Sequence, residues 1–197
     1  VWGEYGVRGE GVTVGVIDSG VDGSHPALAG TWRGRSGDTA SNWWTGTGED
    51  YPLPGDGNGH GTHVTGSIVG QSPGDVTGVA PGAEWMAAKI FTDRGTTTDA
   101  IIHNAFQFML APGGDPAKAP DIVTNSWGSA DGTRTEFWDD VSALVAAGIV
   151  PMFANGNDGP GVGTVGAPGS FPHTIGVGAV DSNDLAASFS SRGPAIW

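Results

Sequence analysis

Residues 11–20, GVTVGVIDSG, set the architecture that the rest of the chain extends. The run is apolar and rich in β-branched residues as far as Ile17, and it stops at the turn-forming Asp18-Ser19-Gly20. An apolar run closed by turn residues predicts a strand buried in a parallel sheet. Asp18 is then expected at the carboxyl end of a strand, where α/β proteins collect functional groups.

Working outward, strand-like runs alternate with helical patterns. We expect further strands at residues 84–91, 121–124, 149–154 and 174–180, and helices at 62–69, 98–110 and 135–147. The second helix has Thr98 or Asp99 as its cap, and Thr135 caps the third, which ends before Gly148. Apolar positions at helical spacing support both, namely Ile101, Ile102, Ala105, Phe106 and Met109, and then Phe137, Trp138, Val141, Leu144 and Val145.

This alternation predicts an α/β fold, a three-layer arrangement with a mostly parallel sheet and helices on both faces. Residues 22–56 are polar and turn-rich, so we expect irregular surface there, anchored by Trp32, Trp43 and Trp44. Residues 76–81 are expected to form a turn. No internal repeat or domain boundary is evident, and 197 residues suffice for one domain with a sizeable core.

The charge balance excludes some partners. A net charge of −13, with only eight scattered Lys and Arg, argues against nucleic acid and against an anionic membrane surface. The absence of Cys is compatible with both a reducing cytosol and secretion. No apolar run approaches the ~20 residues of a membrane helix.

The stretch GNGHGTHV, residues 57–64, places His60 on a glycine-rich loop at the start of an expected helix. A histidine held there is placed to act as a base, which needs a carboxylate to orient it and a nucleophile to deprotonate. Asp18 is the candidate carboxylate, which would accept the Nδ1 proton; the alternative is an ordinary turn residue. The separation of 42 residues does not decide between them.

His60 and His63 lie three residues apart, whereas the zinc-protease helix motif places its histidines four apart beside a Glu. We therefore favour a structural hydrogen bond or core packing for His63 and assign no metal ligands. Asn157 follows the expected strand at 149–154, and its amide could face an oxygen that becomes negative during acyl transfer. The alternatives are a left-handed turn, which Asn tolerates, and Asn155 in the same role.

A glycine pattern at residues 161–166, GVGTVG, matches the dinucleotide-binding fingerprint. That fingerprint requires a helix to open within it. Pro160, Pro168 and Pro172 exclude the helix, so we expect a loop.

Three segments taken together resemble a known family: VGVIDSGVDGSHPAL at 14–28, GHGTHVTG at 59–66 and FANGNDGPG at 153–161. They resemble the Asp, His and oxyanion-Asn blocks of the subtilisin-like serine proteases (subtilases), in that family's order. GVAPGA at 78–83, DIVTNSWGS at 121–129 and SFSSRGP at 188–194 resemble other stretches of the family. The resemblance covers nearly the whole chain, which is similar to the bacterial extracellular branch of the family.

The resemblance implies that Asp18 is the orienting acid and His60 the general base. It makes Asn157 the oxyanion donor in preference to Asn155, because the family's Gly-Asn falls on Gly156-Asn157. It implies that Ser126-Trp127-Gly128 form a wall of the substrate cleft whose backbone pairs with an extended peptide. Trp127 would favour large apolar side chains there; core packing is the alternative.

The chain departs from the family at the nucleophile. The family's Gly-Thr-Ser-x-Ala block is absent, and Gly163-Thr164-Val165 is the nearest match. We therefore expect residues 1–197 to be an incomplete peptidase domain, truncated at the C-terminus and inactive alone. Its expected partners are a polypeptide substrate and either the missing C-terminal part or a second copy. The alternative is a non-catalytic binding or structural protein with the same fold.

The resemblance implies a secreted protein whose chemistry needs no cofactor. It also implies structural calcium in loops, for which Asp75 in the loop between Gly70 and Gly78 is a candidate region.

Overall fold

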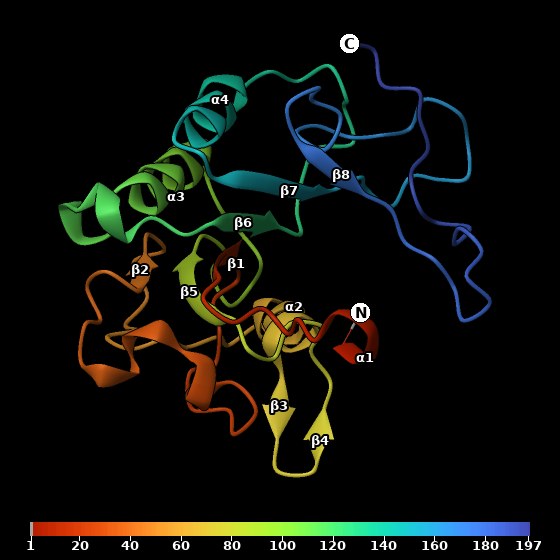
Figure 1. Ribbon diagram of the computed structural model, residues 1–197. Coiled ribbons are helices and arrows are strands. Elements are labelled where there is room, and N and C mark those ends of the chain that lie inside the picture. The colour runs from red at the N-terminus through yellow and green to blue at the C-terminus, as the bar shows by residue number, and fades with distance from the viewer. Residues whose placement is uncertain (1) are drawn as a thin grey trace. The chain divides into compact units, whose positions relative to one another are not determined.

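The computed structural model describes residues 2–197. The chain forms two compact units: unit 1 extends to Val123, and unit 2 comprises Thr124–Trp197. Figure 1 labels the elements of both units. Unit 1 holds α1 (Trp2–Tyr5), β1 (Thr13–Asp18), β2 (Trp43–Thr45), α2 (His60–Val69), β3 (Gln71–Ser72), β4 (Asp75–Val76), β5 (Glu84–Lys89) and α3 (Asp99–Leu110). Strand β6 (Ile122–Asn125) crosses the boundary, and unit 2 holds α4 (Trp138–Ala146), β7 (Val150–Ala154) and β8 (Ile175–Val177).

Parallel strands form the centre of unit 1. Strand β5 pairs in parallel with β1 on one side and with β2 on the other. The register of the first pair runs from Thr13 opposite Glu84 to Asp18 opposite Lys89. Both strands are buried after their first residue, as the apolar runs predict.

Helices cover both faces of this part of the sheet. On one face Val14 and Val16 of β1 cluster with Trp85 of β5 and with Val69, the last residue of α2. On the other face Gly15 lies against α3, because a Cβ added there would come within 2.7 Å of the Met109 sulfur. Alternate residues of one strand therefore face different helices.

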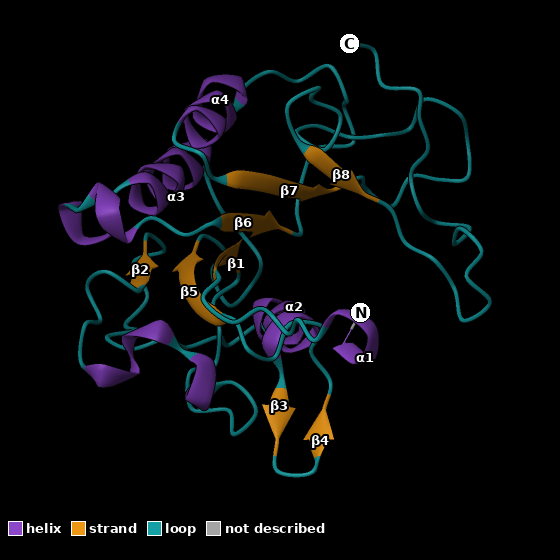
Figure 2. Ribbon diagram, in the orientation of Figure 1, coloured by secondary structure: helices purple, strands orange, loops and turns teal. Residues whose placement is uncertain are grey.

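In unit 2 the strands β7 and β8 are also parallel, with Met152 opposite Ile175. All three residues of β8 are exposed, and Figure 2 shows that loops make up most of the chain beyond β7. The expected α/β class, with a mostly parallel sheet and helices, is confirmed. In the described part of the chain, no helix combines the length and the apolar character that crossing a bilayer requires.

The helix predictions hold with three corrections. Helix α2 begins at His60, two residues earlier than expected. Thr98 caps α3 as expected, and its side chain accepts from the Ile101 N–H. Helix α4 begins three residues later than expected, because the Thr135 carbonyl accepts the Trp138 N–H in a preceding turn; Thr135 is therefore not its cap. Val145 was expected on the buried face but is 43% exposed.

Residues 22–56 are more regular than expected, since they contain β2 and two 3-10 helices, Ala29–Thr31 and Arg33–Ser36. The tryptophans do anchor this region: Trp32 packs against Trp85 and Trp44 stacks on Phe108. The segment before the expected 76–81 turn forms an antiparallel hairpin, β3–β4. Residues 161–166 contain neither helix nor strand, as the prolines predict.

Candidate active site

Asp18, the last residue of β1, is 1% exposed. Its Oδ1 accepts the Ser19 backbone N–H at 2.7 Å and lies 2.6 Å from His60 Nδ1. A carboxylate only accepts hydrogen bonds, so the Nδ1 atom carries the proton of this contact. In the neutral ring, Nε2 is then the free acceptor.

His60 is the first residue of α2, so the helix start positions the ring. Gly59 precedes it with φ 94°, which glycine adopts without strain and which turns the loop into the helix. Gly61 allows the helix to approach β1, because a Cβ there would lie 2.1 Å from the Gly20 carbonyl oxygen. The His60 side chain is 53% exposed, so one side of the pair is open and the other buried.

A second carboxylate, Asp56, fastens the loop that carries His60. Its Oδ1 accepts the backbone N–H groups of Asn58 and Gly59, and its Oδ2 accepts both the N–H and the hydroxyl of Thr62. A carboxylate at a helix N-terminus satisfies amides that have no partner within the helix.

The electrostatics of this pair favour a charged imidazole. The hydrogen bond to Asp18 raises the pKa of His60 above its usual range, burial opposes this, and the charges of Asp18 and Asp56 add to the increase. His60 is therefore a stronger base than a free histidine side chain.

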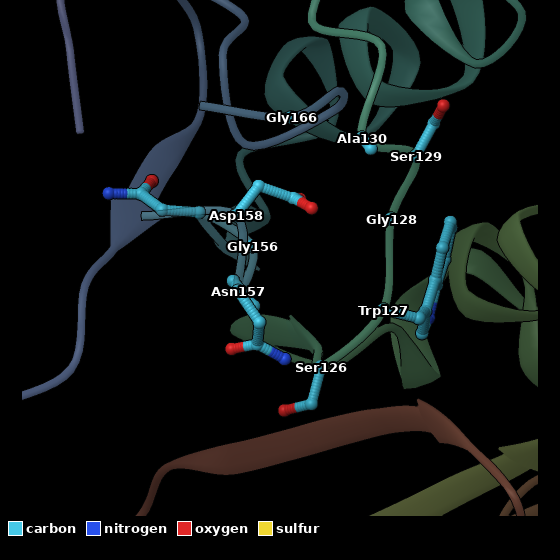
Figure 3. A pocket seen from close by; sticks show the side chains of 11 residues that line it. Ser126, Trp127, Gly128, Ser129, Ala130, Gly156, Asn157, Asp158 and Gly166 are labelled. Atoms are coloured by element: carbon cyan, nitrogen blue, oxygen red, sulfur yellow. The ribbon is translucent and has the colours of Figure 1, made fainter. Parts of the chain in front are cut away.

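Unit 2 contains a separate pocket of about 380 Å³. Figure 3 shows its two walls, residues 126–130 on one side and residues 156–158 on the other. The residues that line it are Ser126, Trp127, Gly128, Ser129, Ala130, Ala154, Asn155, Gly156, Asn157, Asp158 and Gly166. All four expected residues of unit 2, Ser126, Trp127, Gly128 and Asn157, are thus brought together.

Backbone and aromatic contacts hold the walls. The Ser129 N–H donates to the Ala167 carbonyl, and the Gly166 N–H donates to the Asn155 carbonyl. Behind the first wall, Trp127 makes edge-to-face contacts with Phe137 and Phe153 at ring-centroid distances of 5.7 and 5.6 Å. Trp127 therefore both lines the pocket and packs against aromatic neighbours.

The two asparagines of the second wall differ. Asn157 is exposed. Asn155 is half-buried, and its Oδ1 lies so close to Gly176 of β8 that a Cβ there would come within 2.4 Å. The Asn157 amide is thus the one accessible to a ligand in the pocket.

Some expectations fail or stay untested. His63 is exposed rather than packed in the core, and it lines a shallow hollow with His25. Asp75 lies exposed in the β3–β4 hairpin. Within residues 2–197 no group of three or more His, Asp or Glu side chains is arranged to hold a metal ion.

Sequence reasoning missed Ser19, Asp56 and Lys89, which surround the Asp18–His60 pair. The one available signal was the lysine within the apolar run EWMAAKIF at residues 84–91. A lysine in a strand that is otherwise apolar indicates a buried, paired ammonium.

Comparison with known proteins supports the resemblance. The sequence model of the Subtilase family matches residues 9–197. The chain is 39% identical to Bacillopeptidase F of Bacillus subtilis (strain 168) over 98% of its own length, and 37% identical to Subtilisin E of the same strain over 95%. It is 33% identical over 98% of its length to Subtilisin-like protease SBT6.1 of Arabidopsis thaliana. It spans only 14%, 46% and 17% of these relatives, respectively. With nearly every residue inside the family match, the chain belongs to the Subtilase family.

Proposed function

We propose that this chain is part of a secreted serine endopeptidase that hydrolyses peptide bonds through an Asp-His-Ser triad. Membership of the Subtilase family supports a peptidase. The observation that carries the triad is the 2.6 Å contact between His60 Nδ1 and the buried Oδ1 of Asp18. That contact leaves Nε2 of His60 as the acceptor, which is the arrangement a general base needs.

In the proposed reaction, His60 Nε2 takes the proton of a serine hydroxyl as its oxygen attacks the peptide carbonyl. Asp18 keeps the imidazole in the correct tautomer and stabilises the imidazolium. His60 then returns the proton to the leaving amine, and an acyl-enzyme forms. Water hydrolyses this intermediate by the same steps, and the Asn157 amide donates to the oxygen that becomes negative.

The pocket of unit 2 supports a role in holding the substrate. An extended peptide would pair with the backbone of Ser126-Trp127-Gly128 as an added strand. Trp127 would set a preference for large apolar side chains near the bond that is cut. The half-buried ring and its aromatic supports give this wall a fixed position.

The nucleophile is not within these residues, because no Gly-Thr-Ser occurs in the 197-residue sequence. We therefore propose that this chain alone does not hydrolyse peptides. In subtilisin, loss of the serine lowers kcat by about a millionfold.

We propose that the partner of this chain is the serine-bearing segment of the same protein or, failing that, a second copy. Exposed apolar side chains in unit 2 support an apolar association surface, notably Ile175, Val177, Val180, Leu185 and Phe189. The proposed chemistry needs no cofactor, and calcium, if bound, would be structural.

Labelling with a fluorophosphonate, which reacts only with an activated serine, tests the proposal. We expect the serine-bearing parent protein to be labelled, its His60→Ala variant to be almost unlabelled, and the 197-residue chain to be unlabelled. Equal labelling of the parent and its His60→Ala variant would refute the triad. A folded parent that takes no label would instead favour a non-catalytic binding or structural protein.

A further inference from the structure

Lys89, the last residue of β5, is completely buried. It lies opposite Asp18 in the parallel register, yet its ammonium makes no contact with that carboxylate among its described hydrogen bonds and ion pairs. It donates instead to the Ser19 carbonyl oxygen at 2.7 Å and to Asp93 Oδ1 at 2.9 Å. Lysine is almost never fully buried without such partners, and the chemistry of the Asp18–His60 pair does not use this charge.

Ser19 forms hydrogen bonds with three groups around the Asp18–His60 pair. Its N–H donates to Asp18 Oδ1, and its hydroxyl donates to Asp56 Oδ1. The same hydroxyl accepts the Gly61 N–H from the first turn of α2. The orientation of Ser19 therefore decides how Asp18 and the start of the His60 helix are held.

The Ser19 carbonyl is held by a hydrogen bond from Lys89. The Ser19 carbonyl belongs to the peptide unit that precedes Gly20, whose φ of 107° is open to glycine and closed to other residues. A peptide next to glycine rotates more freely, so a hydrogen-bond donor is needed to hold its carbonyl. Lys89 supplies that donor, and its side chain passes within 3.2 Å of where a Cβ of residue 20 would stand.

The ammonium is itself held from several sides. Glu49 Oε2 lies 3.4 Å from it, and the Tyr51 ring centroid lies 4.9 Å away. The Tyr51 hydroxyl donates to Asp93 Oδ2 at 2.8 Å, which fixes the main carboxylate partner. The bond from Lys89, followed by that from Tyr51, lowers the pKa of Asp93 below its usual range, which favours the carboxylate form of this partner.

We propose that Lys89 is a positioning residue for the Asp18–His60 pair, acting through the Ser19 carbonyl. Its importance for peptide hydrolysis rests on the proposed function, but its effect on the pair does not. Loss of the ammonium frees the Ser19–Gly20 peptide and lets Ser19 shift. Its hydroxyl then no longer holds the Gly61 N–H, which fixes the start of the His60 helix against Asp18.

NMR of the 197-residue chain tests this without any peptidase activity. In Lys89→Met we expect the low-field proton of the His60 Nδ1–H···Asp18 bond to be lost and the pKa of His60 to fall towards its ordinary value. The sign is decisive, because removal of a nearby cation by itself would raise the pKa of a histidine. A raised pKa with the proton signal retained overturns the proposal.

The matched control is Lys118→Met, which removes an equal charge from the same unit. Lys118 pairs with Asp38 at 2.9 Å at the surface, where both side chains are 44% exposed. We expect neither the proton signal nor the pKa of His60 to change in this variant. A similar change in both lysine variants would contradict a role specific to Lys89.

Lys89→Met leaves two carboxylates without their cation and could prevent folding. The double variant Lys89→Met/Asp93→Asn removes both charges of the closest pair and leaves the net charge unchanged. The remaining carboxylate, Glu49, has a side chain that is 29% exposed, so water can solvate it. We expect loss of the proton signal and a lower pKa of His60 here too. An intact signal in this folded variant overturns the proposal, whereas an inactive parent with a normal signal would count only against the proposed function.

Discussion

The two candidate sites of this chain are built in different ways. In unit 1 the Asp18–His60 pair is held by side chains, and it includes a carboxylate that is 1% exposed. In unit 2 the pocket walls are held by backbone hydrogen bonds and aromatic contacts, and the candidate polar group, Asn157, is exposed. A buried charge requires fixed partners, whereas an open groove needs only a rigid backbone.

The sheet shows the same contrast. Strand β5 is buried at every residue after Glu84, whereas β8 is exposed at every residue. Since opening free energies follow buried apolar contacts, we expect β5 amides to exchange more slowly than β8 amides. We thus expect the buried Asp18 carboxylate to lie beside a strand that opens rarely, because β1 pairs with β5.

The largest expected effect comes from Asp18→Asn in the serine-bearing parent protein. Without the carboxylate, His60 loses its orienting acceptor and takes the wrong tautomer, so kcat should fall by about 10⁴. The pKa of His60 should fall as well, because the bond to Asp18 is the main cause of its increase. Steady-state kinetics and NMR titration measure the two changes.

The change Asp50→Asn provides the control, since Asp50 is exposed and is not among the causes of the raised pKa of His60. If kcat of Asp18→Asn stayed within tenfold of the value for the unmodified parent, the buried pair would not be essential. Its contrast with the open groove of unit 2 would then carry no functional meaning.

Next in size is Asn157→Ala, which tests the exposed amide of unit 2. Removing one oxyanion donor should lower kcat by about 10²–10³, the magnitude established for subtilisin, while KM changes little. Asn155→Ala is the matched control, because Asn155 lines the same pocket but lies against β8. If Asn155→Ala were the more damaging for kcat, the assignment of the two asparagines would be reversed.

The predictions from sequence were most accurate for elements that depend on a local pattern alone, such as an apolar run or a helix cap. The buried runs at β1 and β5 and the Thr98 cap of α3 follow from local pattern, and the structure confirms them. Strand β2 was missed because it is three residues long and its apolar character comes from tryptophans that also looked like surface anchors. The start of α4 was misplaced because a turn, which pattern cannot detect, precedes the helix.

The candidate site could be predicted only in part. The glycine loop and strand-end position singled out His60 and Asp18, but their separation of 42 residues gave no sign of contact. The bonds from Ser19 to Asp56 and Gly61 were invisible because they cross 37 and 42 residues. Asp56 was overlooked although it bonds to Gly59 and Thr62 within its own loop, a local capping pattern. His63 was misjudged because a histidine on a helix carries no indication of which way it faces.

A smaller effect, on stability, should follow Trp127→Ala. The ring packs edge-to-face on two phenylalanines but is only half-buried, so we expect a loss of about 2 kcal/mol. Hydrogen exchange should quicken in β7 and leave β5 unchanged. Trp127→Phe should restore most of the stability, and an unaltered cleavage preference of the parent Trp127→Ala variant would leave packing as the only role of the ring.

The smallest expected effect is that of Asp56→Asn on the pH dependence. Asp56 is the weakest of the causes that raise the pKa of His60, acting only through its charge. Because the base must be neutral, kcat/KM should rise with pH through the raised pKa of His60, above the ordinary ~6.5. Without the Asp56 charge, this rise should move to lower pH.

Stability should respond with the opposite dependence on pH. A raised pKa means that the fold favours the charged imidazole, so this contribution is complete below the unfolded pKa and is lost as pH rises through the folded one. Asp56→Asn should therefore lower the free energy of unfolding slightly more at low pH, where His60 is charged, than at high pH, where it is neutral. If the rise of kcat/KM moved to higher pH instead, Asp56 would act on His60 mainly by holding the loop at Gly59 and Thr62. An asparagine amide cannot replace both carboxylate oxygens there.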